Sequence, residues 1–398
     1  LALLDDPLAG NPEQRYKALY TYVSPSGLAG HPPVRAATSG EGIHWTTADR
    51  PLYFGRAGSG LGDVLILSCD PDSRTYLCFT RHGNMGFAPR DVPEIQLPAL
   101  GTPRFDVRLG AENRRARRRI FLAESHDFVH WTDPRLVLAP TPELDNVDVG
   151  FYGMAPFRVG GQWLGFLNVL HMVDNTMNVE LAHSRDGRNW RRVAPTHPWL
   201  ECGPAGSWEQ FMVTVSSPPI EVGEQTFVYY GGARNHHDWW FSGTRENHDN
   251  PRLWDHAPEV ADMRAVAYSL GLAKIRRGGF VSLGANRARE GFLVTQPLLS
   301  RGDRLEINAC CGPDGYVVAE VTDVMHNVLP GRLRTECDRF VGDSVAHRIT
   351  WRGDPSIPMP DATGMREGIA YRRIRFFIRD AELYGFRLAG NSRASGQQ

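Results

Sequence analysis

One seven-residue pattern occurs three times in the chain and constrains its fold more than any other feature. The copies read SGEGIHW at residues 39–45, SHDFVHW at 125–131 and SRDGRNW at 184–190. Each has Ser first, an acid third, Gly or Phe fourth, His or Asn sixth and Trp last, and an Ala stands two residues before each Ser. Such self-similarity is typical of repeat architectures in which each unit is a small group of strands.

Strand-turn-strand segments surround each copy. A short alternating run precedes the pattern, and before that run lies a hairpin, as in LILSCDPDSRTYLCFTRH at residues 65–82 and MAPFRVGGQWLGFLNVLH at 154–171. The segment GLAKIRRGGFVSL at 271–283 is a degenerate fourth copy, in which Gly278 keeps the Gly position and the Trp is lost. Helical periodicity is almost absent. Four units of roughly four strands therefore predict an all-β chain whose repeats close into a ring, a β-propeller.

The repeated heptapeptide is interpreted as a turn between outer strands. Its Ser and its acid can accept hydrogen bonds from turn amides, its Gly can take a positive φ, and its Trp can fill the space between adjacent sheets. A scaffold role is favoured over direct ligand binding. Functional residues are therefore expected among those that are not repeated.

The strand pattern changes near Gly291. Alternating segments then follow at short spacing, from GFLVTQPLL to YRRIRFFIRDAELYGFRL, and the heptapeptide does not recur. This pattern predicts a β-sandwich appended to the propeller. The expected domains are a catalytic β-propeller at 1–290, a β-sandwich at 291–390 and a disordered tail at 391–398.

The charge balance argues against nucleic acid and membrane partners. Lys plus Arg number 44 against 45 for Asp plus Glu. No apolar run approaches the roughly 20 residues that span a bilayer. The basic run RRARRR at 114–119 precedes a strand and is predicted to be a solvated loop. The six cysteines form no CxxC pair, which favours buried free thiols.

The first residues of the chain have the pattern expected in the middle of a strand. Its first residues, LALLDDPLAG, lack the basic segment of a signal peptide. We expect the chain to begin after a processed or missing segment. The protein is then expected to be secreted or periplasmic if a leader has been removed, and cytoplasmic otherwise.

A propeller with S-x-D-G-x-x-W turns followed by a β-sandwich resembles the glycoside hydrolases of families 32, 43 and 68. It is more similar to a group of bacterial proteins labelled family 32-like, which share the RYK strand near Tyr16, the segment at 271–283 and the A-x-LY-x-F ending at 381–386. The resemblance implies a five-bladed propeller that acts on furanosides such as fructosyl or arabinofuranosyl units. It also leads us to expect a fifth blade in strands that precede Leu1.

Some motifs of family 32 differ in this chain. W-M-N-D-P-N-G and R-D-P are absent, and LLDDPLAGNP shares only Asp6-Pro7 with the first of them. WLECGP is similar to the W-E-C-P acid/base motif with one inserted residue, and it contains Glu201 and Cys202. The resemblance therefore predicts architecture more strongly than chemistry.

Three unrepeated acids are candidates for catalysis. Glycoside cleavage needs one carboxyl group that protonates the leaving oxygen and another that attacks the anomeric carbon or activates water. Acids near the starts of innermost propeller strands fit this need: Asp63 in GLGDVLIL, Asp148 in LDNVDVGFYGM and Glu209 in GSWEQFMVTV. Asp63 or Asp148 is expected as nucleophile or base, and Glu209 as general acid. The alternatives are that each acid caps a turn or pairs with Arg, and that Glu201 replaces Glu209.

Polar and aromatic residues near the same strand ends are candidates for substrate binding. They are Arg81, Tyr152, His171, Trp208, His236, His237 and Trp239. The last three stand in the loop sequence YYGGARNHHDWWF. Aromatic rings stack on sugar faces and polar groups bind hydroxyls, so this set predicts carbohydrate binding. A metal site at HHD and a plain surface loop are alternatives, and we expect no metal and no cofactor.

The sequence thus predicts a glycosidase that cleaves a small oligosaccharide with paired carboxylates, and the resemblance implies a furanoside. A transglycosylase and a glycoside phosphorylase are alternatives within the same fold, and the phosphorylase needs a basic phosphate pocket. A non-catalytic carbohydrate-binding propeller is the alternative from another class. The expected partner is a small carbohydrate, and the sequence makes no prediction of oligomeric state.

Overall fold

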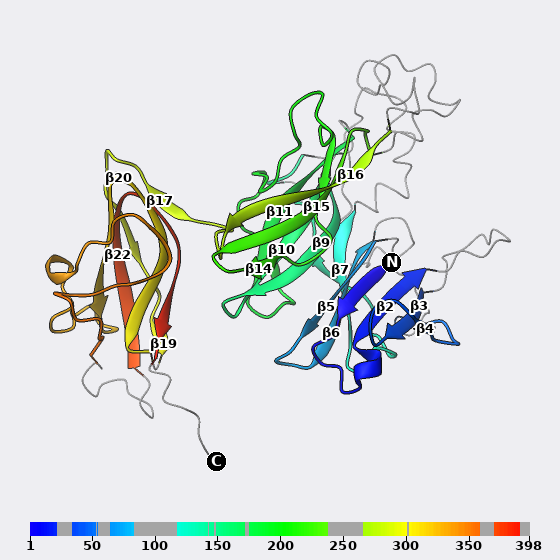
Figure 1. Cartoon of the computed structure of the whole chain (residues 1–398), viewed down its shortest axis with the longest axis horizontal. Coiled ribbons are helices and arrows are strands. Elements are labelled where there is room, and N and C mark those ends of the chain that lie inside the picture. The colour runs from blue at the N-terminus through cyan, green and yellow to red at the C-terminus, as the bar shows by residue number, and fades with distance from the viewer. Residues whose placement is uncertain are drawn as a thin grey trace. The chain divides into compact units, whose positions relative to one another are not determined.

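The chain is built of β-strands (Figure 1). The computed structural model describes residues 1–21, 34–52, 54, 64–82, 118–141, 143–146, 149–171, 175–237, 266–300, 302–358 and 370–390. Within these ranges the helical elements are two short 3-10 helices, Pro12–Gln14 and Arg334–Glu336. In the same ranges no helix is long and apolar enough to cross a membrane. The prediction of an all-β chain is confirmed.

Two four-stranded antiparallel sheets come first, and the strands of each follow chain order. The first sheet comprises β1 (Ala2–Asp5), β2 (Tyr16–Thr21), β3 (Val34–Ser39) and β4 (Thr46–Thr47). The second comprises β5 (Leu65–Asp70), β6 (Thr75–His82), β7 (Arg119–Ser125) and β8 (Arg135–Leu138). Each sheet is a meander of the kind that the sequence predicts for one repeat.

An eight-stranded sheet follows. Its strands are β9 (Val149–Val159), β10 (Gln162–His171), β11 (Thr176–Ser184), β12 (Trp190–Arg192), β13 (Met212–Thr214), β14 (Ile220–Val222), β15 (Gln225–Ala233) and β16 (Tyr268–Arg276). β9 to β12 form a third meander, and β13, β14 and β16 all pair with β15. A parallel bridge from Met177 to Met212 joins the two groups. Four repeats are therefore visible, while closure into a five-bladed ring stays a prediction.

The three heptapeptide copies form turns of one design. In the third copy, Ser184 Oγ accepts a hydrogen bond from the N–H of Gly187 at 3.0 Å, and Asp186 Oδ1 accepts two further amide hydrogen bonds at 2.8 and 2.7 Å. The Ser and the acid of the other two copies accept equivalent amide bonds. The fourth residue has a positive φ in every copy: 83° at Gly42, 66° at Phe128 and 70° at Gly187. The predicted capping and the predicted positive φ are both confirmed.

The tryptophans of the second and third copies are buried, and that of the first is half-buried. Trp131 stacks on Phe54 with ring centroids 5.2 Å apart. Trp190 meets the edge of Phe79 on β6 at 5.8 Å. Because Phe79 belongs to the second sheet and Trp190 to the eight-stranded sheet, this contact joins two repeats.

Arg188, in the third turn, adds polar bonds between the same two sheets. Its Nε lies 2.7 Å from Glu124 Oε1, and its Nη1 lies 2.8 Å from Asp70 Oδ2. Its Nη2 donates to Ser73 Oγ at 3.0 Å. Charge-assisted bonds of this length are stronger than neutral ones, so the turn also ties neighbouring sheets together.

Two compact units divide the chain. The first comprises Leu1–Pro219 and Val228–Ala273, and the second comprises Ile220–Phe227 and Lys274–Gln398. The main division between the units therefore falls between Ala273 and Lys274. The propeller at 1–290 and the sandwich at 291–390 stay predictions. Strands β15 and β16 contribute residues to both units.

Strands β17 to β22, all in the second unit, form one six-stranded sheet around two long strands. β20 (Arg304–Thr322) pairs antiparallel with β22 (Ala370–Ala389). They are flanked by β17 (Leu283–Ala285), β18 (Gly291–Val294), β19 (Leu298–Ser300) and β21 (Asp343–Arg348). The two-sheet sandwich expected here stays a prediction.

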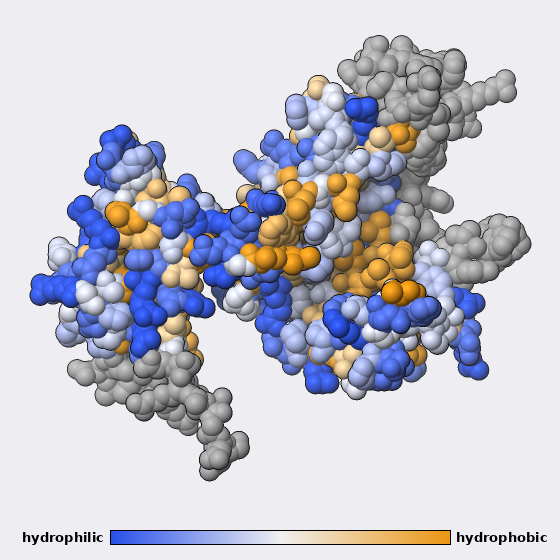
Figure 2. All heavy atoms as spheres, viewed as in Figure 1, coloured by the Kyte–Doolittle hydropathy of each residue, from blue (hydrophilic) through white to orange (hydrophobic). Residues whose placement is uncertain are grey.

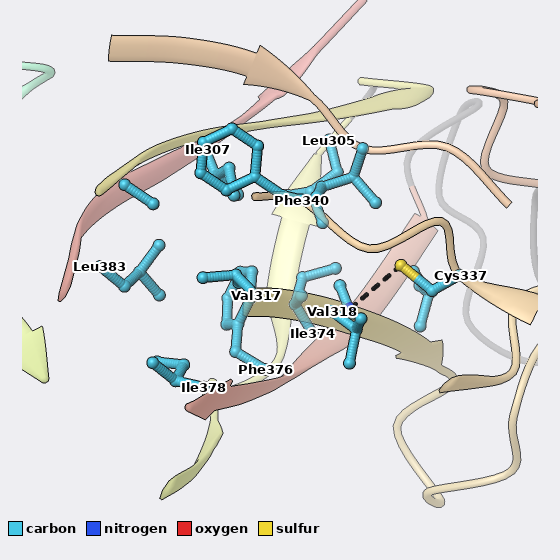
Figure 3. Close-up of a cluster of buried hydrophobic side chains, with 14 of the residues drawn as sticks. Leu305, Ile307, Val317, Val318, Cys337, Phe340, Ile374, Phe376, Ile378 and Leu383 are labelled. Carbon is cyan, nitrogen blue, oxygen red and sulfur yellow. Dashed lines mark hydrogen bonds between the residues drawn. The ribbon is translucent and has the colours of Figure 1, made fainter. Parts of the chain in front are cut away.

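Alternate residues of β20 and β22 form the core of the second unit (Figure 3). Ile374 and Phe376 of β22 are fully buried. Trp351 packs into the same core and donates its Nε1–H to the carbonyl of Ala319 at 3.0 Å. Cys337 Sγ accepts a hydrogen bond from the N–H of Ala319 at 3.2 Å. All six cysteines of the chain are free thiols; two are buried and four are half-buried.

The basic run at 114–119 ends inside a sheet. Arg119 is the first residue of β7 and is 2% exposed. The prediction of a solvated loop is therefore wrong for this residue, because strand pairing continues to it. Burial lowers the pKa of its guanidinium.

Candidate functional site

The candidate site lies at the end of the sheets opposite to the second and third heptapeptide turns. β6 ends and β7 begins at the paired residues His82 and Arg119, and β10 ends at His171. β13 begins and β15 ends at the paired residues Met212 and Ala233. The two turns follow the other ends of β7 and β11. One rim of the first unit therefore collects strand ends at which the sequence predicts functional residues.

Tyr152 on β9 is the centre of a group of predicted residues. The guanidinium carbon of Arg81 on β6 lies 4.2 Å from the centroid of the Tyr152 ring, and that of Arg118 lies 5.2 Å from it. The ring of His237, which follows β15, meets Tyr152 edge-on at 4.9 Å. Cations are attracted to the face of an aromatic ring. Residues from three separate parts of the chain thus converge on one side chain.

Packing and backbone hydrogen bonds hold this group in place. Tyr152 packs against an apolar cluster that consists of Leu170, Met177, Met212 and Ala233. The N–H of His237 donates to the carbonyl of Asn175 at 2.9 Å. The N–H of Phe151 donates to the carbonyl of Arg118 at 2.9 Å, which fixes the start of β7 beside β9.

Glu209 belongs to a second group, with Trp208 and Tyr230. Tyr230 Oη donates a hydrogen bond to Glu209 Oε2 at 2.6 Å. The rings of Trp208 and Tyr230 stack with centroids 5.7 Å apart and planes 27° apart. Burial, together with the hydrogen bond to Glu209 and the charge of Glu209, raises the pKa of Tyr230 to about 12. Tyr230 therefore keeps its proton near neutral pH and acts on Glu209 as a donor.

The segment 203–211 carries Trp208 and Glu209 and forms a loop that a backbone hydrogen bond closes. The N–H of Gly203 donates to the carbonyl of Glu209 at 3.1 Å. At its end, Phe211 stacks on His236 with ring centroids 3.7 Å apart. His237, the next residue, contacts Tyr152. The stacking of Phe211 on His236 therefore places the Glu209 group and the Tyr152 group on the same rim.

The structure brings some predicted residues together and leaves others apart. The two groups contain Arg81, Tyr152, Trp208, Glu209 and His237. Three predicted residues lie outside the described part of the chain: Asp63, Asp148 and Trp239. His171 accepts a hydrogen bond from Asn178 Nδ2 at 3.1 Å, and His236 is buried at 5% exposure. Glu201, the alternative acid, is exposed.

Sequence patterns do not single out Arg118 and Tyr230 as site residues. Arg118 belongs to the basic run at 114–119, whose charge predicts a solvated loop. Tyr230 stands beside Tyr229, and strand alternation places the two rings on opposite faces of β15. Tyr229 is 43% exposed, and Figure 2 shows apolar side chains gathered at the surface over β15 and β16, where Leu270 and Leu272 are exposed. Strand alternation predicts that one of the two tyrosines faces inward, and the structure shows that this is Tyr230.

Two buried acids, Asp145 before β9 and Glu180 on β11, form ion pairs with one arginine. Arg192 Nη1 lies 2.6 Å from Asp145 Oδ1, and its Nε lies 2.6 Å from Glu180 Oε2. The two acidic side chains are 1% and 4% exposed. A buried network of this kind fixes structure, so neither acid is a candidate for catalysis. Across the described ranges, no three His, Cys, Asp or Glu side chains are grouped so as to hold a metal ion.

No family model matches the chain, and no curated protein matches it. One similar solved structure comes from work on the GH130 family of mannoside phosphorylases, which contains glycoside hydrolases that target β-1,2 mannosidic linkages in Candida mannan; it is 16% identical, with a TM-score of 0.37 over 55% of this chain and 56% of that chain. An N-acetylgalactosamine deacetylase from F. plautii, in complex with blood group B trisaccharide, is 16% identical, with a TM-score of 0.40 over 67% and 71%. A β-1,2-mannobiose phosphorylase from Listeria innocua is 19% identical, with a TM-score of 0.31 over 52% and 48%. The chain thus spans about half the length of the first and third of these proteins.

Proposed function

We propose that this chain is a glycoside hydrolase that cleaves a glycosidic bond in a small oligosaccharide, with a furanoside as its substrate. The observation that carries the proposal is the carboxyl of Glu209, held beside two stacked rings on the rim that also carries Arg81, Tyr152 and His237. Aromatic faces beside a few polar groups are the usual means by which proteins bind sugars.

In this proposal Glu209 is the general acid. It gives a proton to the glycosidic oxygen as the bond to the anomeric carbon breaks. Asp63 or Asp148 supplies the second carboxylate, which attacks the anomeric carbon or activates water. A five-bladed propeller is the architecture proposed with this chemistry, because it directs the starts of inner strands to one funnel. Arg81, Tyr152, Trp208 and His237 then line the sugar subsites.

Two guanidinium groups beside one ring favour a second candidate, a glycoside phosphorylase. Arg81 and Arg118 both lie within about 5 Å of the Tyr152 ring. The planar guanidinium of arginine can donate two parallel hydrogen bonds to the oxygens of a phosphate, so a pair of arginines favours phosphate binding. In that case inorganic phosphate takes the place of water as the acceptor of the glycosyl group.

Product release tests both candidates. Wild type, Glu209→Gln and the control Glu201→Gln are incubated with a panel of furanosidic and pyranosidic oligosaccharides, with and without inorganic phosphate, and the products are separated by chromatography. Release that Glu209→Gln abolishes and Glu201→Gln leaves unchanged supports the glycosidase. Release that requires phosphate supports the phosphorylase. No release from any substrate in the panel argues instead for a non-catalytic carbohydrate-binding protein.

A further inference from the structure

We propose that Tyr230 is the residue that positions Glu209 for catalysis. Its hydroxyl holds Oε2 of the carboxyl group, so that the proton transferred in the reaction leaves from Oε1. This inference rests on the proposed role of Glu209 as general acid. It adds a residue that sequence analysis does not single out, and it assigns separate tasks to the two carboxyl oxygens.

The hydrogen bond itself gives this assignment. Tyr230 Oη lies 2.6 Å from Glu209 Oε2, a short distance for a hydroxyl donor. Oε2 accepts the hydrogen bond from the Tyr230 hydroxyl, so a protonated Glu209 carries its own proton on Oε1. A carboxyl group with one oxygen held in this way has few orientations left.

Three glycines leave the space that this arrangement needs. A Cβ at Gly203 would lie 2.7 Å from Glu209 Cγ, and a Cβ at Gly232 would lie 2.9 Å from Glu209 Cβ. A Cβ at Gly271 would lie 2.5 Å from Tyr230 Cζ. Real Cβ atoms essentially never come this close, and none of these glycines has a positive φ. The space around the pair, and not a backbone conformation, therefore requires glycine at all three positions.

Trp208 fixes the plane of the tyrosine ring. It stacks on Tyr230, and a Cβ at Gly232 or Gly271 would overlap it as well. The backbone of β16 at Gly271 thus lies close to both rings, that of Tyr230 and that of Trp208. Packing against Trp208 and against this backbone restricts the Tyr230 ring in the orientation that directs its hydroxyl to Glu209.

The chemical step balances with these roles. The Oε1–H bond of Glu209 breaks and its proton goes to the glycosidic oxygen, while the bond from that oxygen to the anomeric carbon breaks and its electron pair stays on the oxygen. The second carboxylate of the proposed function, or the water that it activates, supplies the electron pair for the new bond to the anomeric carbon. Tyr230 keeps its proton throughout. Its hydrogen bond strengthens as negative charge develops on the carboxyl group, because bonds to ionised acceptors are the stronger ones.

The test uses Tyr230→Phe, which removes the hydroxyl and keeps the ring that stacks on Trp208. The control is Tyr229→Phe, which removes the hydroxyl of the neighbouring ring on the exposed face of β15. Wild type, both variants and Glu209→Gln are assayed on two glycosides of the sugar found to be cleaved. One has an alkyl alcohol as its leaving group, and the other has 2,4-dinitrophenol, which departs without protonation.

Tyr230→Phe is expected to lower kcat about 10- to 100-fold on the alkyl glycoside with KM little changed, and less than about 3-fold on the dinitrophenyl glycoside. Glu209→Gln is expected to show the same selectivity with a larger loss, and Tyr229→Phe to match wild type. A merely structural role would lower both rates together, and that result would overturn the inference.

The remaining outcomes separate the inference from the proposed function. If Glu209→Gln shows the selective loss and Tyr230→Phe matches wild type on both glycosides, the positioning role is wrong and the glycosidase stands. If Glu209→Gln also matches wild type, Glu209 is not the acid and the inference falls with that assignment. If wild type cleaves neither the panel nor these glycosides, the proposed function itself is overturned.

Discussion

Asn168 on β10 is hydrogen-bonded to Val215, the residue after β13, although β10 and β13 do not pair with each other, and its replacement by Leu is expected to destabilise the first unit by about 1–5 kcal/mol. Its Nδ2 donates to the carbonyl of Val215 at 3.1 Å, and its Oδ1 accepts the N–H of Val215 at 2.9 Å. Asn168 is 3% exposed and Val215 is fully buried. Leu has the same number of side-chain heavy atoms and the same branching at Cγ, but it leaves both backbone groups without a partner. Each such group costs about 1–3 kcal/mol, and apolar burial of Leu offsets about 1 kcal/mol of the total.

The measurement is a urea titration of the full chain, followed by tryptophan fluorescence and by far-ultraviolet circular dichroism. The control is Gln162→Leu, at the exposed start of the same strand, for which a change within about 0.5 kcal/mol is expected. The midpoint of Asn168→Leu should fall while the slope with denaturant stays the same. A loss below about 1 kcal/mol, or one equal to that of the control, would refute the reasoning, because it would mean that Val215 finds other partners.

Three further substitutions test the scaffold. Gly187→Ala is expected to destabilise the chain by about 1–2 kcal/mol, because φ there is 70° and the new Cβ would lie 3.0 Å from Trp163 Cε2; an unchanged thermal melt would contradict this. Arg119→Met is expected to stabilise it by about 1–3 kcal/mol, because Nε and Nη2 of Arg119 are buried without a hydrogen-bond partner in the described part of the chain; a lower melting temperature would count against it. Burial tends to raise the pKa of Asp70, but hydrogen bonds, including one from Arg188, lower it below its usual value. The pair of Arg188 and Asp70 therefore stabilises the fold above about pH 4, and this contribution is lost as the pH falls. Arg188→Gln should therefore flatten the dependence of unfolding free energy on pH between about pH 5 and 2, and an unchanged slope would show that the pair is not responsible.

The turns were predictable from sequence because their hydrogen bonds are local. Ser184, Asp186 and Gly187 satisfy one another within four residues, so the heptapeptide alone specifies the conformation. Phe128 stands where the other two copies have Gly, and it too has a positive φ, of 66°. The same hydrogen bonds from turn amides to the Ser and the acid hold it in this conformation. The unit boundary was harder to predict, because the alternating pattern continues from Ala273 into Lys274 with no change in the sequence.

The candidate site was predictable only in part, because it depends on contacts between residues far apart in the chain. Sequence position suggested Arg81, Tyr152 and His237, since each stands near a strand end. It gave no means to foresee that Tyr230, in the middle of a strand, bonds Glu209, because that contact depends on which face of β15 meets the segment 203–211. Arg119 was misassigned for the same reason: charge predicts solvent exposure, and strand pairing overrode it.

The separation of the turns from the candidate site has a consequence for how such a chain can change over evolutionary time. β6 ends and β7 begins, and β15 ends and β16 begins, at the rim that carries the candidate site, whereas the second and third heptapeptide turns stand at the opposite end. The entropy cost of closing a loop grows only slowly with its length. Under the proposed function, insertions between these strand ends are expected to alter ligand preference without disturbing the interlocked sheets. The same two places are where a protein engineer would graft new recognition loops.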